Sequence, residues 1–218
     1  MQLLLFLTIG KLLSIIVGLL CYKLLSPAFR IALLQVVVAM CAEIYGYYLS
    51  TNSDNNLWFF NFYWLVEMWI VGWIAMKTLT DKRIIRIITY LLLTATFILA
   101  LNIYIHGVKF YANWGISFIC ITLVIVYLIV LFNNLFGTKK LLTDAIFWFS
   151  ISILLFYGCL LPYYGLFNFL YSRYPDILNQ FFNITIALDF IRYPIVALSF
   201  YLFARRQKAI MQENTSVV

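Results

Sequence analysis

The sequence predicts an all-α integral membrane protein with seven transmembrane helices, and two observations carry this prediction. Of the 218 residues, 65% are hydrophobic and 11% are charged, whereas soluble domains have roughly 25% charged residues. Seven apolar segments, separated by short polar breaks, are each long enough to cross a hydrocarbon core of about 30 Å. We therefore expect one seven-helix domain over residues 1–204 and a short cytoplasmic tail over residues 205–218.

The first apolar segment, residues 3–25, has no basic residue before it and no small-residue cleavage pattern, so we expect a retained helix. The other helices are expected at residues 30–50, 57–78, 84–105, 114–136, 145–171 and 177–204. The last two are long enough to tilt or protrude, and they contain the intramembrane prolines Pro162 and Pro194. The absence of an internal repeat argues against a carrier built from two similar triplets of helices.

Lysine and arginine are distributed unevenly between the two ends of the predicted helices. The first, third and fifth breaks and the tail contain eleven of the fifteen basic residues: Lys23, Arg30, Lys77, Lys82, Arg83, Arg86, Lys139, Lys140, Arg205, Arg206 and Lys208. The other breaks contain only Lys109 and Arg173. The positive-inside rule then places the N-terminus outside and the C-terminus in the cytoplasm. The net charge of +7 thus indicates topology and a lipid bilayer, and it does not predict a nucleic-acid partner.

Five ionisable residues interrupt the apolar segments: Lys11, Glu43, Glu67, Asp189 and Arg192. A charge at bilayer depth costs about 2.5 to 3.5 kcal/mol on insertion scales, so each must pair or face a polar cavity. We expect Lys11 to pair with Glu43 or Glu67, and Asp189 to pair with Arg192 along its own helix. Because three carboxylates face two bases, either burial keeps one carboxyl protonated or an exogenous cation or donor completes the set.

Polar and aromatic residues accompany these charges on the same helix faces. Tyr63 lies one turn from Glu67, and Tyr157 and Tyr164 share one face of the sixth helix. Asn61 and Asn183 favour interhelical hydrogen bonds over ligand contacts. The candidate ligand- or ion-binding cluster comprises Lys11, Glu43, Tyr63, Glu67, Asp189 and Arg192, with Asn61, Tyr157, Tyr164 and Asn183 as secondary members. The alternative is a structural lock that holds the helices in register.

The residue inventory assigns no catalytic residue, metal site or cofactor. His106 is the single histidine, which argues against a multi-histidine metal site and against a Ser-His-Asp arrangement. In microbial rhodopsins a Schiff-base lysine follows an aspartate by four residues on the seventh helix. Here Tyr193 stands four residues after Asp189, so a retinal protein is not expected.

Three stretches resemble a known group of membrane proteins. They are NFYWLVEMW at residues 61–69, FWFSISILLFYGCLLPYYGLFN at 147–168 and IALDFIRYPIVALSFYL at 186–202. These stretches are similar to short seven-span integral membrane proteins of Bacteroidota, a group without an established function. The resemblance implies a multi-pass protein of the bacterial inner (cytoplasmic) membrane and adds no catalytic role.

The leading functional hypothesis is a receptor-like seven-transmembrane sensor with a buried polar pocket for a small-molecule ligand. Because the loops and tail are short, its output would require a separate cytoplasmic or membrane protein partner. A proton- or ion-coupled small-molecule transporter, with Glu67 and Asp189 as titrating groups, stays open as the first alternative. A membrane-embedded lipid-processing enzyme and a structural subunit of a membrane complex stay open as the second.

Overall fold

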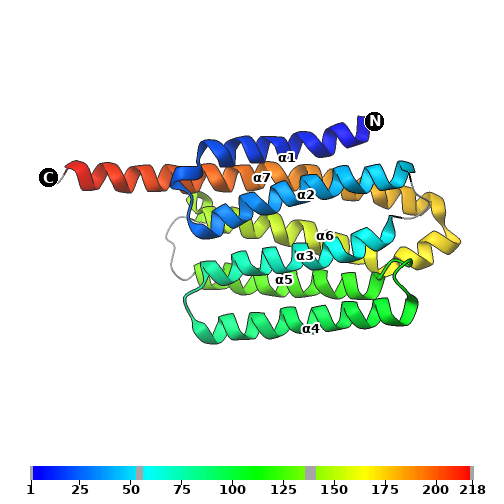
Figure 1. The fold of residues 1–218 in the computed structure, drawn as a ribbon. Coiled ribbons are helices and arrows are strands. Elements are labelled where there is room, and N and C mark those ends of the chain that lie inside the picture. Colours follow the sequence, from blue (N-terminus) through cyan, green and yellow to red (C-terminus); the bar gives the residue numbers. More distant parts are fainter. Residues whose placement is uncertain (1, 53–55, 136–140, 217–218) are drawn as a thin grey trace.

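The computed structural model describes residues 2–52, 56–135 and 141–216, which contain seven α-helices and no strand (Figure 1). The helices are α1 (Gln2–Leu20), α2 (Pro27–Asn52), α3 (Leu57–Thr78), α4 (Lys82–His106), α5 (Asn113–Leu135), α6 (Ala145–Arg173) and α7 (Pro175–Ser216). Helices α2 to α7 are long and apolar enough to cross a membrane, whereas α1 contributes a shorter apolar stretch, Thr8–Leu20. The all-helical prediction is confirmed, and six of the seven predicted spans meet the length that a bilayer requires.

Six of the helices form a closed ring, and α4 packs against its outside. Around this ring, α1 contacts α2 and α7, α2 contacts α3, α3 contacts α5, and α6 contacts both α5 and α7. Helix α4 packs against α3 and α5 at the edge of the bundle (Figure 1). It exposes large side chains such as Tyr90, Phe97 and Tyr104.

Three residues explain where helices begin and end. The carboxylate of Asp81 accepts a hydrogen bond from the backbone N–H of Arg83 at the start of α4. At the start of α6, Asp144 accepts one from the backbone N–H of Phe147. Both are N-caps that satisfy an otherwise unpaired donor. Gly107 follows α4 with φ of 85°, a conformation that only glycine adopts without strain.

Helix α7 is 42 residues long and extends beyond the rest of the bundle (Figure 1). It does not end at residue 204, where the sequence predicts the end of the seventh span, but continues as a helix to Ser216. Pro162 and Pro194 lie inside α6 and α7, and both helices continue through them. Residues 205–216 are therefore a direct extension of a helix that also forms part of the bundle wall.

Aromatic side chains fill the end of the bundle from which α7 protrudes. The ring of Phe29 on α2 lies 6.0 Å from that of Phe149 on α6. On α7, the rings of Phe200 and Phe203 lie 6.1 and 4.8 Å from the same Phe29 ring. These contacts join α2 to α6 and α7 directly. At the opposite end of the bundle the same helices are separated by a cavity.

Candidate ligand-binding site

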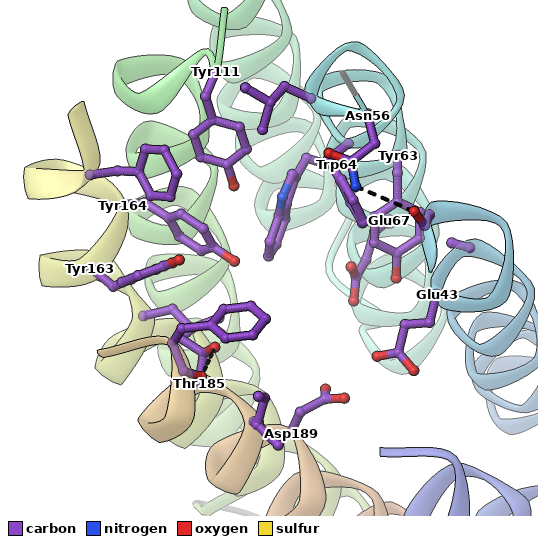
Figure 2. A pocket seen from close by; sticks show the side chains of 18 of the residues that line it. Glu43, Asn56, Tyr63, Trp64, Glu67, Tyr111, Tyr163, Tyr164, Thr185 and Asp189 are labelled. Carbon is purple, nitrogen blue, oxygen red and sulfur yellow. Dashed lines mark hydrogen bonds between the residues drawn. The ribbon is translucent and has the colours of Figure 1, made fainter. Parts of the chain in front are cut away.

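A cavity of about 550 Å³ lies between α2 and α3 on one side and α6 and α7 on the other (Figure 2). Its lining reaches Ser50 and Asn56 beside the α2–α3 connection and Tyr171 near the end of α6. It also includes Tyr111 from the α4–α5 connection. The cavity thus occupies the half of the bundle that carries the α2–α3, α4–α5 and α6–α7 connections, and its volume is typical of small-molecule sites.

Four of the five predicted intramembrane charges line the inner part of this cavity: Glu43, Glu67, Asp189 and Arg192. Glu67 lies ten residues, or about 15 Å, into α3. The fifth, Lys11 on α1, is 1% exposed and lies behind Glu43 and Asp189. We call these five residues the charged floor. The structure brings them together from α1, α2, α3 and α7.

Lys11 holds together the first part of the floor. Its ammonium donates a hydrogen bond to Glu43 Oε1 at 2.6 Å and another to Asp189 Oδ2. The expected pairing of Lys11 with Glu43 is confirmed. The expected Asp189–Arg192 pair is wrong, because Asp189 is directed towards α1 while Arg192 is directed towards α3.

Arg192 and Glu67 form the second part of the floor. Arg192 Nη1 donates to Glu67 Oε1 at 3.0 Å, and Gln35 Nε2 donates to the same oxygen at 3.0 Å. The guanidinium also lies over the ring of Phe156, 4.4 Å from its centroid. Arg192 is 1% exposed and Glu67 is 3% exposed. Because Glu67 is already occupied by these donors, it is not the partner of Lys11.

The ring of Tyr193 lies beside both parts of the floor. Lys11 Nζ is 4.3 Å from the ring centroid, and the guanidinium carbon of Arg192 is 5.3 Å from it. Ser14 on α1 donates to the backbone carbonyl of Tyr193, which fixes α1 against α7 at this level. The two cations therefore share one aromatic neighbour while each has its own carboxylate partners.

Several hydrogen-bonding groups in the floor or next to it have no partner among the described residues. They are Nε and Nη2 of Arg192, Oε1 of Gln35 and the hydroxyl of Tyr157. Buried polar groups of this kind are normally satisfied by ordered water or by a ligand. The two donors of Arg192 that lack a partner therefore belong to a side chain that lines the cavity.

Uncharged aromatic rings form the wall between the floor and the opening (Figure 2). Tyr164 lies at the centre of this wall, with its ring 5.1 Å from Trp64, 5.8 Å from Tyr111 and 5.0 Å from Tyr163. Burial raises the pKa of the Tyr111 hydroxyl well above its ordinary value, so Tyr111 stays neutral at physiological pH. The wall therefore offers apolar area and ring faces without adding charge.

The remaining predicted residues divide into three groups. Tyr63 and Tyr164 line the cavity. Tyr157 is fully buried and packs against Arg192 and Trp64, so it supports the site without lining it. Asn183 is exposed and lies outside the lining of this cavity.

Asn61 is fully buried and makes hydrogen bonds away from the main cavity. Its Nδ2 donates to the carbonyl of Phe110 at 2.8 Å, and its Oδ1 accepts from the backbone N–H of Ala112 at 3.0 Å. The side chain thus anchors the α4–α5 connection to α3. Asn61 was expected to bond to another helix, but its partners are backbone groups of the α4–α5 connection.

The candidate cluster predicted from the sequence does not include five residues that contact the floor or form the wall: Gln35, Trp64, Tyr111, Tyr163 and Tyr193. Gln35 carries a usable signal, because it lies eight residues before Glu43 on the same face of α2. Tyr111 carries none, since it lies in a connection without helical periodicity. Tyr163 is adjacent to Tyr164 and does not share the face that Tyr157 and Tyr164 define.

Comparisons of the chain with protein-family models, curated proteins and solved structures gave no match. Among the described residues there is no group of three or more His, Cys, Asp or Glu side chains that could hold a metal ion. The function is therefore inferred from the geometry of the floor and the cavity.

Proposed function

We propose that this protein is a receptor-like seven-transmembrane sensor that binds a small molecule in the cavity and signals through a separate protein partner. The observation that supports this most is the cavity itself, which combines about 550 Å³ of space with a charged floor and aromatic walls. A concave, mostly apolar site with a few convergent polar groups is the usual form of a small-molecule site.

The opening of the cavity faces the outside of a bacterial inner membrane in this proposal, and the protruding end of α7 lies in the cytoplasm. Nine exposed basic residues support this orientation, because all lie at the end opposite the cavity: Lys23, Arg30, Lys77, Lys82, Arg83, Arg86, Arg205, Arg206 and Lys208. Lys109 and Arg173 lie at the cavity end. Lys139 and Lys140, which also entered the prediction, lie outside the described residues. This distribution satisfies the positive-inside rule.

A sensor is consistent with the path beyond the floor, which is filled in this structure. The Phe29 ring and its aromatic neighbours on α6 and α7 occupy the cytoplasmic half of the bundle. A ligand that enters from outside meets the charged floor and then a packed aromatic core. Sensing requires access from one side only, whereas a carrier must open both sides in turn.

Helix α7 is suited to carry the signal to a partner. It supplies Asp189 and Arg192 to the floor and continues without a break into the segment that protrudes from the bundle. On this segment, Arg206 lies 3.7 Å from Asp144, the N-cap of α6. A ligand that shifts α7 at the floor would therefore also alter this contact and the surface around it.

The test compares two substitutions on neighbouring residues of α7. Thr185 lines the cavity, whereas Ile184 is exposed on the outer surface of the bundle. Purified protein in detergent is screened against small molecules by thermal unfolding. A ligand at 100 times its dissociation constant stabilises the folded state by about 2.7 kcal/mol.

We expect Thr185→Trp, which fills the cavity, to remove the ligand-induced rise in unfolding temperature. Ile184→Trp should retain it. If no compound stabilises the native protein, or if Thr185→Trp responds as the native protein does, the proposal fails.

A proton- or ion-coupled transporter is the second candidate, and the shared ammonium of Lys11 favours it. One cation serves two carboxylates, Glu43 and Asp189, so uptake or release of a proton or cation there would change the local charge balance. Flux measured across liposomes containing the protein separates the candidates. Flux that Glu43→Gln abolishes would support transport, whereas flux equal to that of empty liposomes supports the sensor.

A further inference from the structure

We propose that the cavity's ligand is an organic monocation, a protonated amine carried on an aromatic or apolar body. This inference rests on the proposed function and goes further, because it assigns the ligand's head group to Glu43 and Asp189 and its body to the aromatic wall. The argument uses three independent observations: the charge balance of the floor, the unused donors of Arg192 and the chemistry of the wall.

The charge balance is negative where the floor meets the cavity. Glu43 and Asp189 both line the cavity, and their side chains are 26% and 12% exposed. The ammonium of Lys11, at 1% exposure, lies behind them and contacts both carboxylates. With both carboxylates ionised, one positive charge compensates two negative ones, and the uncompensated charge lies on the side that a ligand reaches. A buried carboxylate without a compensating charge is costly, so a cationic group gains a strong interaction there.

The second part of the floor does not cancel this negative charge. Arg192 and Glu67 form a one-to-one ion pair at 3.0 Å and contribute no net charge. Arg192 nevertheless keeps two buried donors, Nε and Nη2, that no described residue accepts. A hydroxyl, ether or carbonyl oxygen on the ligand, placed a few bonds from its amine, would satisfy them. These donors are a second line of evidence for a ligand, and this evidence does not depend on the acidic residues.

The wall suits the body of such a ligand. Tyr163, Tyr164 and Trp64 line the cavity, and the faces of aromatic rings carry the negative part of their quadrupole. Aromatic ring faces can contact an apolar group and can also attract a nearby cationic group. An inorganic cation or a proton would complete the floor but would leave this wall without a function.

The proposal is tested with three probes that share one ring system and differ in the head group. They are 2-(1-naphthyl)ethylamine, 2-(1-naphthyl)ethanol and 1-naphthylacetate, which are cationic, neutral and anionic at pH 7. Dissociation constants come from thermal unfolding of the purified full-length protein at increasing probe concentration. We expect the amine to bind at least about tenfold more tightly than the alcohol, and the carboxylate to bind more weakly than both.

Two variants assign this preference to the floor. Glu43→Gln and Asp189→Asn each remove one negative charge with little change of shape, so either should reduce the amine-to-alcohol ratio to near one while alcohol binding persists. Two variants are used because each carboxylate also accepts a hydrogen bond from Lys11, so either substitution alone could also affect folding. Asp176→Asn is the matched control: it makes the same change on α7 at an exposed position outside the cavity, and the ratio should stay unchanged.

The possible outcomes distinguish a failure of the monocation assignment from a failure of the proposed sensor function. If the three probes stabilise the protein equally and Thr185→Trp abolishes all three effects, the cavity is a binding site but the monocation assignment is overturned. A preference for the amine that survives in both Glu43→Gln and Asp189→Asn also overturns it. If no probe and no library compound binds, the proposed sensor function itself fails.

Discussion

Arg192 is the residue on which the site's architecture depends most. It is nearly inaccessible, it forms an ion pair with Glu67, and it packs against Phe156, Tyr157 and Tyr193. Water does not solvate a charge that is buried within a bilayer, so its protein partners must stabilise it in the folded state. Removing one member of such a buried set leaves the others without compensation.

Removing either partner of the Arg192–Glu67 pair should be strongly destabilising. Arg192→Met or Glu67→Met alone leaves an uncompensated buried charge and should lower the free energy of unfolding by about 3 to 5 kcal/mol. The double substitution should cost less than the sum of the two, with a coupling of about 1 to 3 kcal/mol. Denaturant unfolding in detergent measures all three variants.

A pair near the surface provides the control for this cycle. Arg206 is 66% exposed and lies 3.7 Å from Asp144, so Arg206→Met should cost less than about 1 kcal/mol. Additive costs for the Arg192 and Glu67 substitutions would contradict the assignment of these two residues as partners.

Asn61→Ala should also destabilise the protein, through the α4–α5 connection. The substitution leaves the buried N–H of Ala112 without its acceptor, which costs about 1 to 3 kcal/mol. Asn183→Ala changes the same side chain at an exposed site and should have no measurable effect. Hydrogen exchange of residues 108–112 should rise in Asn61→Ala. Equal stability of the two variants would remove the anchoring role of Asn61.

The identity of the floor residues could be predicted from the sequence, but only the Lys11–Glu43 contact among their pairings could. A charge inside an apolar segment is visible without a structure, and its cost guarantees that it must be satisfied. Which partner satisfies it depends on the rotation of each helix about its axis. Asp189 and Arg192 are close enough in sequence to pair, yet they contact α1 and α3 respectively. The unused donors of Arg192 likewise became visible only in the folded structure.

At the scale of helices, the crossing of α4 and α5 depends on a glycine. A Cβ atom built on Gly115 would lie 2.7 Å from the Cα of Leu99, so the two backbones could not approach as they do. The N–H of Gly115 also donates to Asn102 on α4 at 2.9 Å. Small residues at such crossings allow close packing of transmembrane helices.

Gly115→Ala should therefore destabilise the protein by about 1 to 3 kcal/mol, because the obstacle is backbone that cannot rotate away. Gly158→Ala provides the control on α6, since a Cβ there meets nothing within 4 Å. That change should be neutral or stabilise by up to about 1 kcal/mol, because alanine favours the helix more than glycine does. Thermal unfolding of the two variants gives the comparison, and a loss at Gly158 equal to that at Gly115 would contradict this account of the crossing.

The number and type of the helices could be predicted from the apolar segments, whereas the helix lengths were predicted less accurately. Hydropathy marks where a chain enters and leaves a membrane, whereas a helix ends where its backbone finds other partners. The end of α7 shows the difference: residues beyond 204 are too polar to continue a span but remain helical. The ring order of the helices was not predictable, because the short connections fix neighbours in sequence but not which helices meet across the bundle.

At the scale of the whole molecule, the bundle divides into two halves of different character. The half next to the basic helix ends is filled by rings around Phe29, and the other half contains the cavity above the charged floor. The proposed function requires that the cavity admits small polar molecules from the outside of the membrane and leads no further than the floor. Thr185 lines the cavity one helical turn before Asp189. The accessibility of position 185 to a water-soluble reagent therefore tests this requirement.

The most direct measurement is the rate at which a membrane-impermeant, cationic thiosulfonate modifies Thr185→Cys in intact cells. The four native cysteines are first replaced, and Ile184→Cys on the exposed surface of the bundle serves as the control. We predict modification of Thr185→Cys from the outside and none of Ile184→Cys, because a charged reagent reaches a water-accessible cavity but not a lipid-facing position. Modification of Thr185→Cys in inverted membrane vesicles alone, or in neither preparation although the denatured protein reacts, would contradict the account.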